Sequence, residues 1–203
     1  MIVGDRSKLA IESGITMAFD SSSSLFALGY FVLHIGGRCY GVARGDATML
    51  GCSFDQVARI IANRGQHDAG VLTFTDAVEF ADNYLNAIYG ELQRPMYSGV
   101  SAENFCRLFH QEKGNIVWAP DGDAAFDDSS HVLLFDSGNR VRLIAFQSGE
   151  DSRHVPSTLQ DIWVVAGEFY CILRDWYDAF QSEWIHTPKS PSDRFYTEFP
   201  VID

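Results

Sequence analysis

An acidic stretch near the middle of the chain has the residue types best suited to chemistry. The sequence DGDAAFDD places four carboxylates within eight residues, at Asp121, Asp123, Asp127 and Asp128. Carboxylate oxygens are the ligands that calcium prefers, but an EF-hand loop would have Asp or Asn at Ala125 and Gly at Phe126. Two interpretations stay open for this stretch: a solvated loop with Asx turns, or a negatively charged contact surface for another protein.

A second acidic stretch runs from residue 76 to residue 93. It contains no Lys or Arg, and it carries Asp76, Glu79, Asp82 and Glu91. Residues 114–139 likewise contain no Lys or Arg and hold five aspartates. If the two stretches lie side by side, their carboxylates form one negative field that attracts a basic partner. We therefore expect a partner-binding surface made of Asp121, Asp123, Asp127, Asp128, Asp76, Glu79 and Asp82.

Motifs of known catalytic sites are absent from the sequence. It has no P-loop, no GxSxG elbow and no HExxH pair, and its six histidines are scattered. The four cysteines form no CxxC pair, so neither zinc nor thioredoxin-like chemistry is indicated. We expect a non-catalytic protein without cofactor or metal, with reduced thiols, three of them buried in apolar surroundings. A carboxylate-dependent hydrolase stays as an alternative with less support, because no spacing singles out a pair of acids.

The net charge of −12 narrows the classes of partner. Phosphate backbones and acidic lipid surfaces repel such a protein, so we expect neither a nucleic acid nor a membrane as partner. A basic protein is attracted over long distances, which speeds encounter. The longest apolar run, residues 25–35, is far short of the ~20 residues of a membrane span. Because no targeting segment is evident, we expect a cytoplasmic protein.

The N-terminal third has the pattern of an antiparallel meander. Apolar residues alternate over residues 9–19, which predicts a strand with one face on a core, entered through a turn at Gly4-Asp5. A serine-rich loop, residues 20–24, leads to the apolar run 25–35, which we expect to be a central strand. Gly36-Gly37 predicts a two-residue turn, and residues 38–43 predict a third strand.

Helical periodicity dominates the centre of the chain. Apolar stripes predict one helix through residues 50–61 and another from about residue 76 to residue 92. Ser101 is expected to cap a short third helix that Gly114 ends. Residues 131–136 and 140–147 flank Ser137-Gly138-Asn139, which predicts a second β-hairpin.

The C-terminal part predicts a long amphipathic helix that starts near Ser157. Its first part also fits a strand, since Gly167 interrupts the helical pattern. Tyr170 and Tyr177 lie off the apolar stripe, and we expect them to be exposed contact anchors. Together the elements predict a single α+β domain over residues 1–203.

Three short segments carry a resemblance to a known family. The start MIVGD, LAIE at residues 9–12 and GGRCYG at residues 36–41, with the aromatic-rich second strand, resemble the immunity protein 42 family of bacterial polymorphic toxin systems. The resemblance implies an α+β fold and a protein that neutralises a cognate toxin inside the producing cell. The acidic charge favours a basic toxin, with a nuclease as one candidate. An acidic adaptor that binds a non-toxic protein is the alternative.

Overall fold

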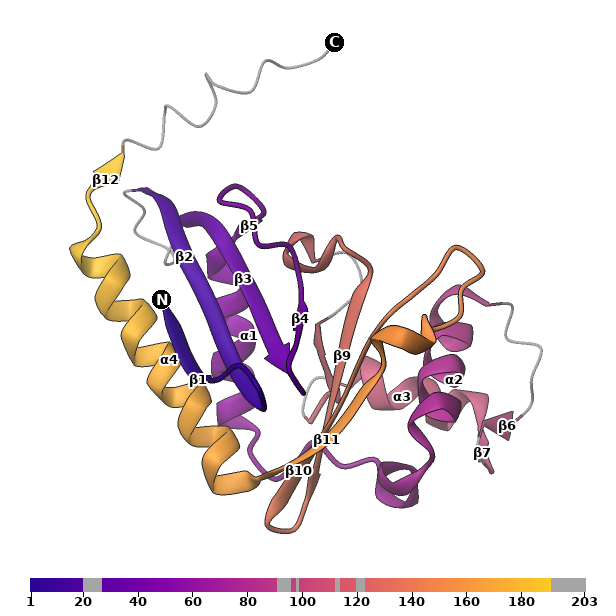
Figure 1. Ribbon diagram of the computed structural model, residues 1–203. Helices are drawn as coiled ribbons and strands as arrows, with labels where there is room; N and C mark the ends of the chain where they lie inside the picture. The colour runs from indigo at the N-terminus through magenta and orange to yellow at the C-terminus, as the bar shows by residue number, and fades with distance from the viewer. Residues whose placement is uncertain (20–26, 91–95, 98, 112–113, 120–122, 191–203) are drawn as a thin grey trace.

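Two large, mainly antiparallel sheets, one small hairpin and four α-helices make up the described part of the protein in the computed structural model (Figure 1). The structure describes residues 1–19, 27–90, 96–97, 99–111, 114–119 and 123–190. The helices are α1 (Leu50–Ala62), α2 (Ala77–Tyr89), α3 (Ala102–His110) and α4 (Ala166–His186), with short 3-10 turns η1 (Gly70–Phe74), η2 (Ala124–Phe126) and η3 (Pro156–Thr158). The content of helices and antiparallel sheets confirms the α+β class.

The first sheet confirms the predicted meander and extends it. Its central order is β1 (Ile2–Asp5), β2 (Leu9–Phe19), β3 (Ala27–Ile35) and β4 (Arg38–Tyr40). Two short strands join it, β5 (Thr48–Met49) on β3 and β12 (Lys189–Ser190) parallel to β2. Gly36 and Gly37 form the turn with φ of 59° and 82°, the positive values that a tight hairpin requires. The serine-rich loop lies outside the described residues.

The start of the chain differs from the expectation. Residues 2–5 themselves pair with β2, so four strands form the meander, and the turn follows Asp5. The Asp5 carboxylate accepts a hydrogen bond from the backbone N–H of Ser7 at 2.8 Å, which fixes that turn. The third predicted strand ends at Tyr40, because Gly41 takes a φ of 106° and turns the chain away.

The second sheet has the order β11 (Gln160–Val165), β10 (Arg140–Gln147), β9 (Ser130–Ser137) and β8 (Val117–Ala119). The hairpin β9–β10 was predicted, with Gly138 at a φ of 59° in its turn. The expectation of a continuous helix from Ser157 is wrong, and its strand alternative is right. Residues 160–165 pair with β10, and the helix begins only at Ala166. A separate small hairpin joins β6 (Met96–Tyr97) and β7 (Val100–Ser101).

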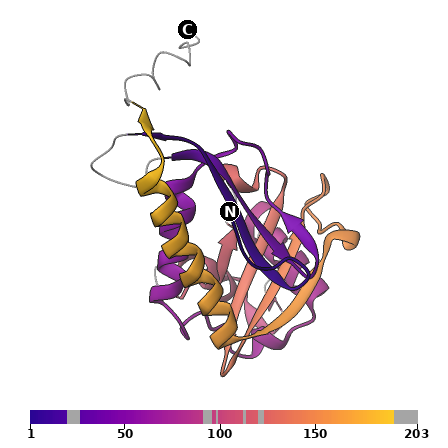
Figure 2. The same ribbon diagram turned by 60° about the vertical axis from the view of Figure 1, so that its left-hand side comes forward.

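Strands β9 and β10 lie between two hydrophobic clusters. Alternate residues on one face of these strands, among them Leu134 and Leu143, pack with the first sheet, α1 and α4. The residues on the opposite face, among them Phe135 and Ile144, pack with α2 and α3. Figure 1 shows this arrangement, with α2 and α3 on the opposite side of the second sheet from the first sheet. Figure 2 shows α4 running alongside α1 and the first sheet. The two clusters share the second sheet, so it couples all four helices.

Several expected exposures are wrong. Cys39, Cys52 and Cys171 are exposed and Cys106 is half-buried, although apolar neighbours in the sequence indicated buried thiols. Tyr170 is fully buried, because its hydroxyl donates to the buried Asp136 carboxylate at 3.0 Å. Burial, followed by the negative charge of Asp136, raises the pKa of Tyr170 above its ordinary value. Tyr177 is partly buried and stacks on Phe54 at 4.1 Å between ring centroids.

The outer face of the first sheet carries a charged cluster around Glu12. The Glu12 carboxylate accepts a hydrogen bond from the Arg6 guanidinium at 2.7 Å and lies 2.9 Å from Nε2 of His34. Desolvation alone would raise the pKa of Glu12, but the bonds from His34 and Arg6 outweigh it, so this pKa lies below its ordinary value. The cluster ties the β1–β2 turn to β3.

Replacing Glu12 by Gln is expected to lower the free energy of unfolding by about 1 kcal/mol at neutral pH. Because the pKa of Glu12 is lower in the folded state, its contribution is present above the unfolded pKa and is lost as pH falls through the folded pKa. Urea unfolding of E12Q should therefore converge with wild type in acid. The exposed Glu103→Gln serves as control, and an equal loss at all pH values would contradict the argument.

Candidate partner-binding surface

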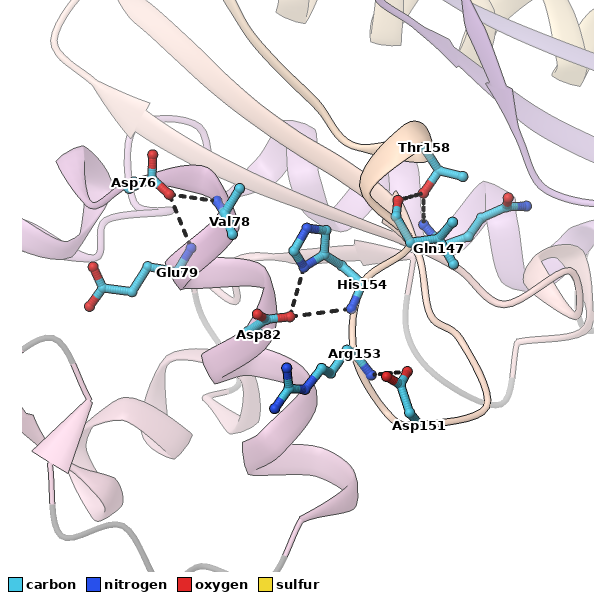
Figure 3. A network of polar contacts seen from close by, with 10 residues as sticks. Asp76, Val78, Glu79, Asp82, Gln147, Asp151, Arg153, His154 and Thr158 are labelled. Atoms are coloured by element: carbon cyan, nitrogen blue, oxygen red, sulfur yellow. Dashed lines mark hydrogen bonds and ion pairs between the residues drawn. The ribbon is translucent and has the colours of Figure 1, made fainter.

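Three acidic residues follow one another at the start and along the first turns of α2: Asp76, Glu79 and Asp82 (Figure 3). Asp76 caps the helix, and its carboxylate accepts hydrogen bonds from the backbone N–H groups of Val78 at 3.0 Å and Glu79 at 3.2 Å. Asp is among the residue types preferred at this position, because its carboxylate satisfies N–H groups that the helix leaves unpaired. Glu79 is exposed and directs its carboxylate away from Asp82.

Asp82 joins α2 to the loop of residues 148–155. Its Oδ1 accepts a hydrogen bond from the backbone N–H of His154 at 3.3 Å and lies 2.7 Å from the ring Nδ1 of the same residue. The loop is a tight turn in which the Asp151 carboxylate accepts from the backbone N–H of Arg153. Glu150 and Asp151 are exposed, so the loop adds two carboxylates to the three on α2. Over residues 76–89 and 148–155 the chain has five acids and one base, Arg153.

Exposed apolar side chains accompany these acids. Seven large apolar residues are exposed in the part of the chain that the structure describes, and four of them lie within residues 71–89. They are Val71 at 80% exposure, Phe74 at 69%, Val78 at 45% and Tyr89 at 44%. Val78, Asp82 and Tyr89 share one side of α2, because four- and seven-residue steps return to the same helix face. We call η1, the outer side of α2 and loop 148–155 the α2 surface.

The sequence pointed to three of the five acids of this surface, Asp76, Glu79 and Asp82, and did not point to the two acids of loop 148–155 or to the apolar residues. Val71 and Phe74 precede the helix cap in the short segment GVLTF. In the sequence, the apolar residues of this segment look like ordinary core residues. In the structure only Leu72 of the three apolar residues in η1 is buried. The available signal was the length of the segment, since a single turn between Gly70 and the Asp76 cap cannot bury apolar side chains that point in different directions.

The other acidic stretch lies elsewhere and has a different environment. Ala125 and Phe126 of η2 belong to the cluster with the first sheet, whereas α2 packs against the opposite face of the second sheet. The structure therefore places η2 and α2 on opposite faces of the second sheet, and a link between the α2 surface and the other stretch is the hydrogen bond from the Ser148 N–H to the Ser129 carbonyl at 3.0 Å. Asp127 is exposed, and Asp121 lies outside the described residues. Asp123 accepts a hydrogen bond from the Ala125 N–H at 2.9 Å, and burial raises its pKa.

Asp128 acts as an internal acceptor for three donors. Its carboxylate accepts from the Gly41 N–H at 3.1 Å, from the Gln147 side chain at 3.1 Å and from the Ser130 N–H at 3.2 Å. Strand β4 ends at Tyr40, so the next backbone N–H, that of Gly41, has no partner in the strand ladder. The Asp128 carboxylate accepts its hydrogen bond. Asp128 thereby links the end of β4 to β9 and β10.

Replacing Asp128 by Ala is expected to lower the free energy of unfolding by about 1–3 kcal/mol, because partly buried donors lose their acceptor. The matched control is Asp127→Ala, one residue away and exposed, which should change stability by less than about 0.5 kcal/mol. Urea unfolding midpoints measure both. Equal midpoints for the two variants would show that Asp128 is a surface residue like its neighbour.

Two clefts bear on the hydrolase alternative. A cleft of about 540 Å³ between α1, α2, α3 and β8 is lined by polar residues such as Arg59 and Gln111, and none of its described lining residues is a carboxylate. A second cleft, of about 360 Å³, is lined by Asp68 and Asp136 among others, but Asp136 accepts hydrogen bonds from Tyr170 and from the His67 N–H. Among the described residues, no group of three His, Cys, Asp or Glu is placed to hold a metal ion. Among the lining residues that the structure describes, neither cleft offers two uncommitted carboxylates for acid–base chemistry.

Comparison with known proteins identifies the family. The family model for immunity protein 42 matches residues 1–179. The chain belongs to the immunity protein 42 family. A crystal structure of CdiI from Burkholderia dolosa AUO158 has the same fold, with a TM-score of 0.55 and 19% identity over 88% of this chain and 99% of that chain. A comparison with curated proteins gave no match.

Membership of the immunity protein 42 family supports a toxin-neutralising role, which the N-terminal segments had indicated. Immunity proteins bind a cognate toxin, so the relevant site is a surface for another protein. No helix within the described ranges is long and apolar enough to cross a membrane.

Proposed function

We propose that this immunity protein neutralises a basic toxin by covering it with the α2 surface, without making or breaking a covalent bond. The observation that carries the proposal is the coincidence of five carboxylates with four exposed apolar side chains on η1, α2 and loop 148–155. Apolar and aromatic residues at the centre of an interface supply most of the binding energy, and surrounding charges guide the encounter.

The charge of the protein favours a basic partner. At −12, the whole chain attracts a positively charged toxin from beyond the contact distance, and the α2 surface concentrates that attraction. A nuclease is the toxin class that fits best, because an enzyme that attracts phosphate backbones is itself basic. Capture by an acidic surface would also compete directly with nucleic acid for the toxin.

We place this neutralisation in the cytoplasm of the producing cell. The four cysteines are free thiols in the structure, three of them exposed, and exposed thiols persist in a reducing compartment. A toxin made in that cell would meet the protein there before it is released.

Co-expression with the toxin encoded beside this chain's gene tests the proposal. Cells that make the toxin alone should die, whereas cells that make both proteins should survive, and the two proteins should co-elute on gel filtration. Survival without a complex would indicate another mode of protection. Cell death together with no complex would refute the toxin-neutralising role, and a stable complex with a non-toxic protein instead would favour the adaptor alternative.

A further inference from the structure

The second sheet ends in a strand whose outer side pairs with none of the described strands. β11 is the edge strand of the order β11-β10-β9-β8, and within the described part of the chain it pairs with β10 alone (Figure 1). The backbone N–H of Ala166 donates to the Asn139 carbonyl at 2.8 Å, beside the register pair Arg140–Val165. In an antiparallel ladder this spacing makes residues 160, 162 and 164 bond inward, so the N–H and C=O groups of Asp161, Trp163 and Val165 point to the outer edge.

The outer sides of the edge strands β8, β4 and β1 are either bonded to other groups or interrupted. At β8, the side-chain amide of Gln56 donates to the outward carbonyl of Val117 at 3.0 Å. Beyond β4, the N–H of Val42 donates to the Ala125 carbonyl at 2.8 Å. β1 is four residues long and takes a φ of 101° at Gly4. Proteins commonly protect edges in these ways, whereas β11 shows no such device among the described residues apart from the charge of Asp161.

The side chains beside this open edge have the composition of a protein interface. Trp163 stacks on the exposed Phe74 with ring centroids 6.0 Å apart, and the Arg140 guanidinium lies 5.3 Å from the centre of the Trp163 ring. Val165 is 56% exposed on the same face of the strand. Trp and Arg are enriched among the residues that dominate binding energy. Through Phe74, the edge is continuous with the α2 surface.

We propose that the outer edge of β11 pairs with an extended segment of the cognate toxin, which adds an antiparallel or parallel strand to the second sheet. The inference rests on the proposed function and specifies how the partner docks. Backbone groups of Asp161, Trp163 and Val165 bond to the added strand, and its apolar side chains pack on Trp163 and Phe74. Basic residues that flank the segment face the carboxylates of the α2 surface.

Val165→Pro tests the backbone pairing with little cost to the fold. Val165 has a φ of −63°, the value that proline requires, and it is the N-cap of α4, where an N–H is not used by the helix. The substitution removes one outward N–H and places the ring where the toxin strand would lie. The matched control is Val165→Ala, which keeps the N–H and loses most of the apolar side chain.

The measurement is the affinity of the purified full-length variants for the toxin domain encoded beside the gene, inactivated in its own catalytic site. V165P should bind at least about tenfold more weakly than wild type, and V165A within about threefold. Urea midpoints establish that both variants are folded. If V165P binds as tightly as V165A while wild type neutralises the toxin, the edge proposal fails and the proposed function stands.

Amide hydrogen exchange on the wild-type complex gives a second, independent readout. The amides of Asp161, Trp163 and Val165 should exchange at least about tenfold more slowly with toxin than without it. Unchanged exchange at these three amides in a stable complex would overturn the proposal, even if V165P did not fold. Protection that appears in the chain alone and rises with concentration would overturn it too, because a second copy would then occupy the edge.

Discussion

Removing the three charges of α2 is expected to slow capture of the toxin by about tenfold at low ionic strength. The variant is Asp76→Asn, Glu79→Gln and Asp82→Asn combined. Asn still caps a helix, and an Asn at position 82 still offers an oxygen to the N–H of His154, so the fold should be retained. The loss should appear in the association rate, because charges at the edge of an interface act mainly on encounter.

Stopped-flow association at several salt concentrations measures this effect. Wild type should slow steeply as salt screens its charge, whereas the α2 variant should show a shallower dependence. The matched control removes the same number of charges elsewhere, with Asp55, Asp175 and Asp178 changed to Asn on the exposed sides of α1 and α4. If both triple variants slow equally, net charge attracts the toxin and the α2 surface has no special role.

The two kinds of residue on the α2 surface are expected to act at different stages of binding. Carboxylates act at long range and are screened by salt, so they affect how often the toxin arrives in a suitable orientation. Phe74 and Val71 act only at contact, where burial of apolar area slows dissociation. A surface that holds both therefore allows capture that is fast and long-lived, as protection from a toxin requires.

Local patterns in the sequence predicted most of the longer elements. Period-two alternation located β2, and two glycines with positive φ located the turn before β4. Asp76 and Ser101 cap α2 and α3 as their types and positions indicate. These features depend on neighbours within a few residues, which is why sequence alone is enough for them.

Features that depend on distant contacts were harder to predict. The apolar residues at 160–165 fit both a strand and the start of the following helix. They form a strand because they pair with β10. Tyr170 lies off the apolar stripe of α4 yet is buried, because its hydroxyl reaches Asp136 on β9. The strand at residues 160–165 and the burial of Tyr170 both depend on contacts with the second sheet. Local sequence patterns do not predict where that sheet lies.

In the candidate site, too, local features could be predicted from the sequence and features that depend on distant contacts could not. The acids of α2 stood out because charge is visible in the sequence, whereas Asp128 looked equivalent to them and is an internal acceptor. What gives Asp128 its role is the supply of unpaired donors nearby, because the end of β4 presents the backbone N–H of Gly41 to its carboxylate. That supply is a property of the tertiary structure.

Replacing Arg142 by Ala is expected to lower the free energy of unfolding by about 3 kcal/mol, the largest effect of a single substitution that we predict. Arg142 is 4% exposed, and its guanidinium donates two parallel hydrogen bonds of 2.8 Å to the Asp161 carboxylate. It also donates to the carbonyls of Thr73 at 2.6 Å and Thr75 at 2.8 Å. Without the guanidinium, a carboxylate and two carbonyls lose their donors together.

Arg142 should also control where Phe74 lies, because its two carbonyl partners flank that residue on either side. Lys at position 142 cannot supply the same fork of donors, so R142K should recover only part of the stability. The control is Arg140→Ala on the same strand, which is exposed and should cost less than about 1 kcal/mol. Urea unfolding compares the three variants. A loss for R142A no larger than that for R140A would mean that solvent replaces the four bonds, and that η1 is held in place by its apolar contacts alone.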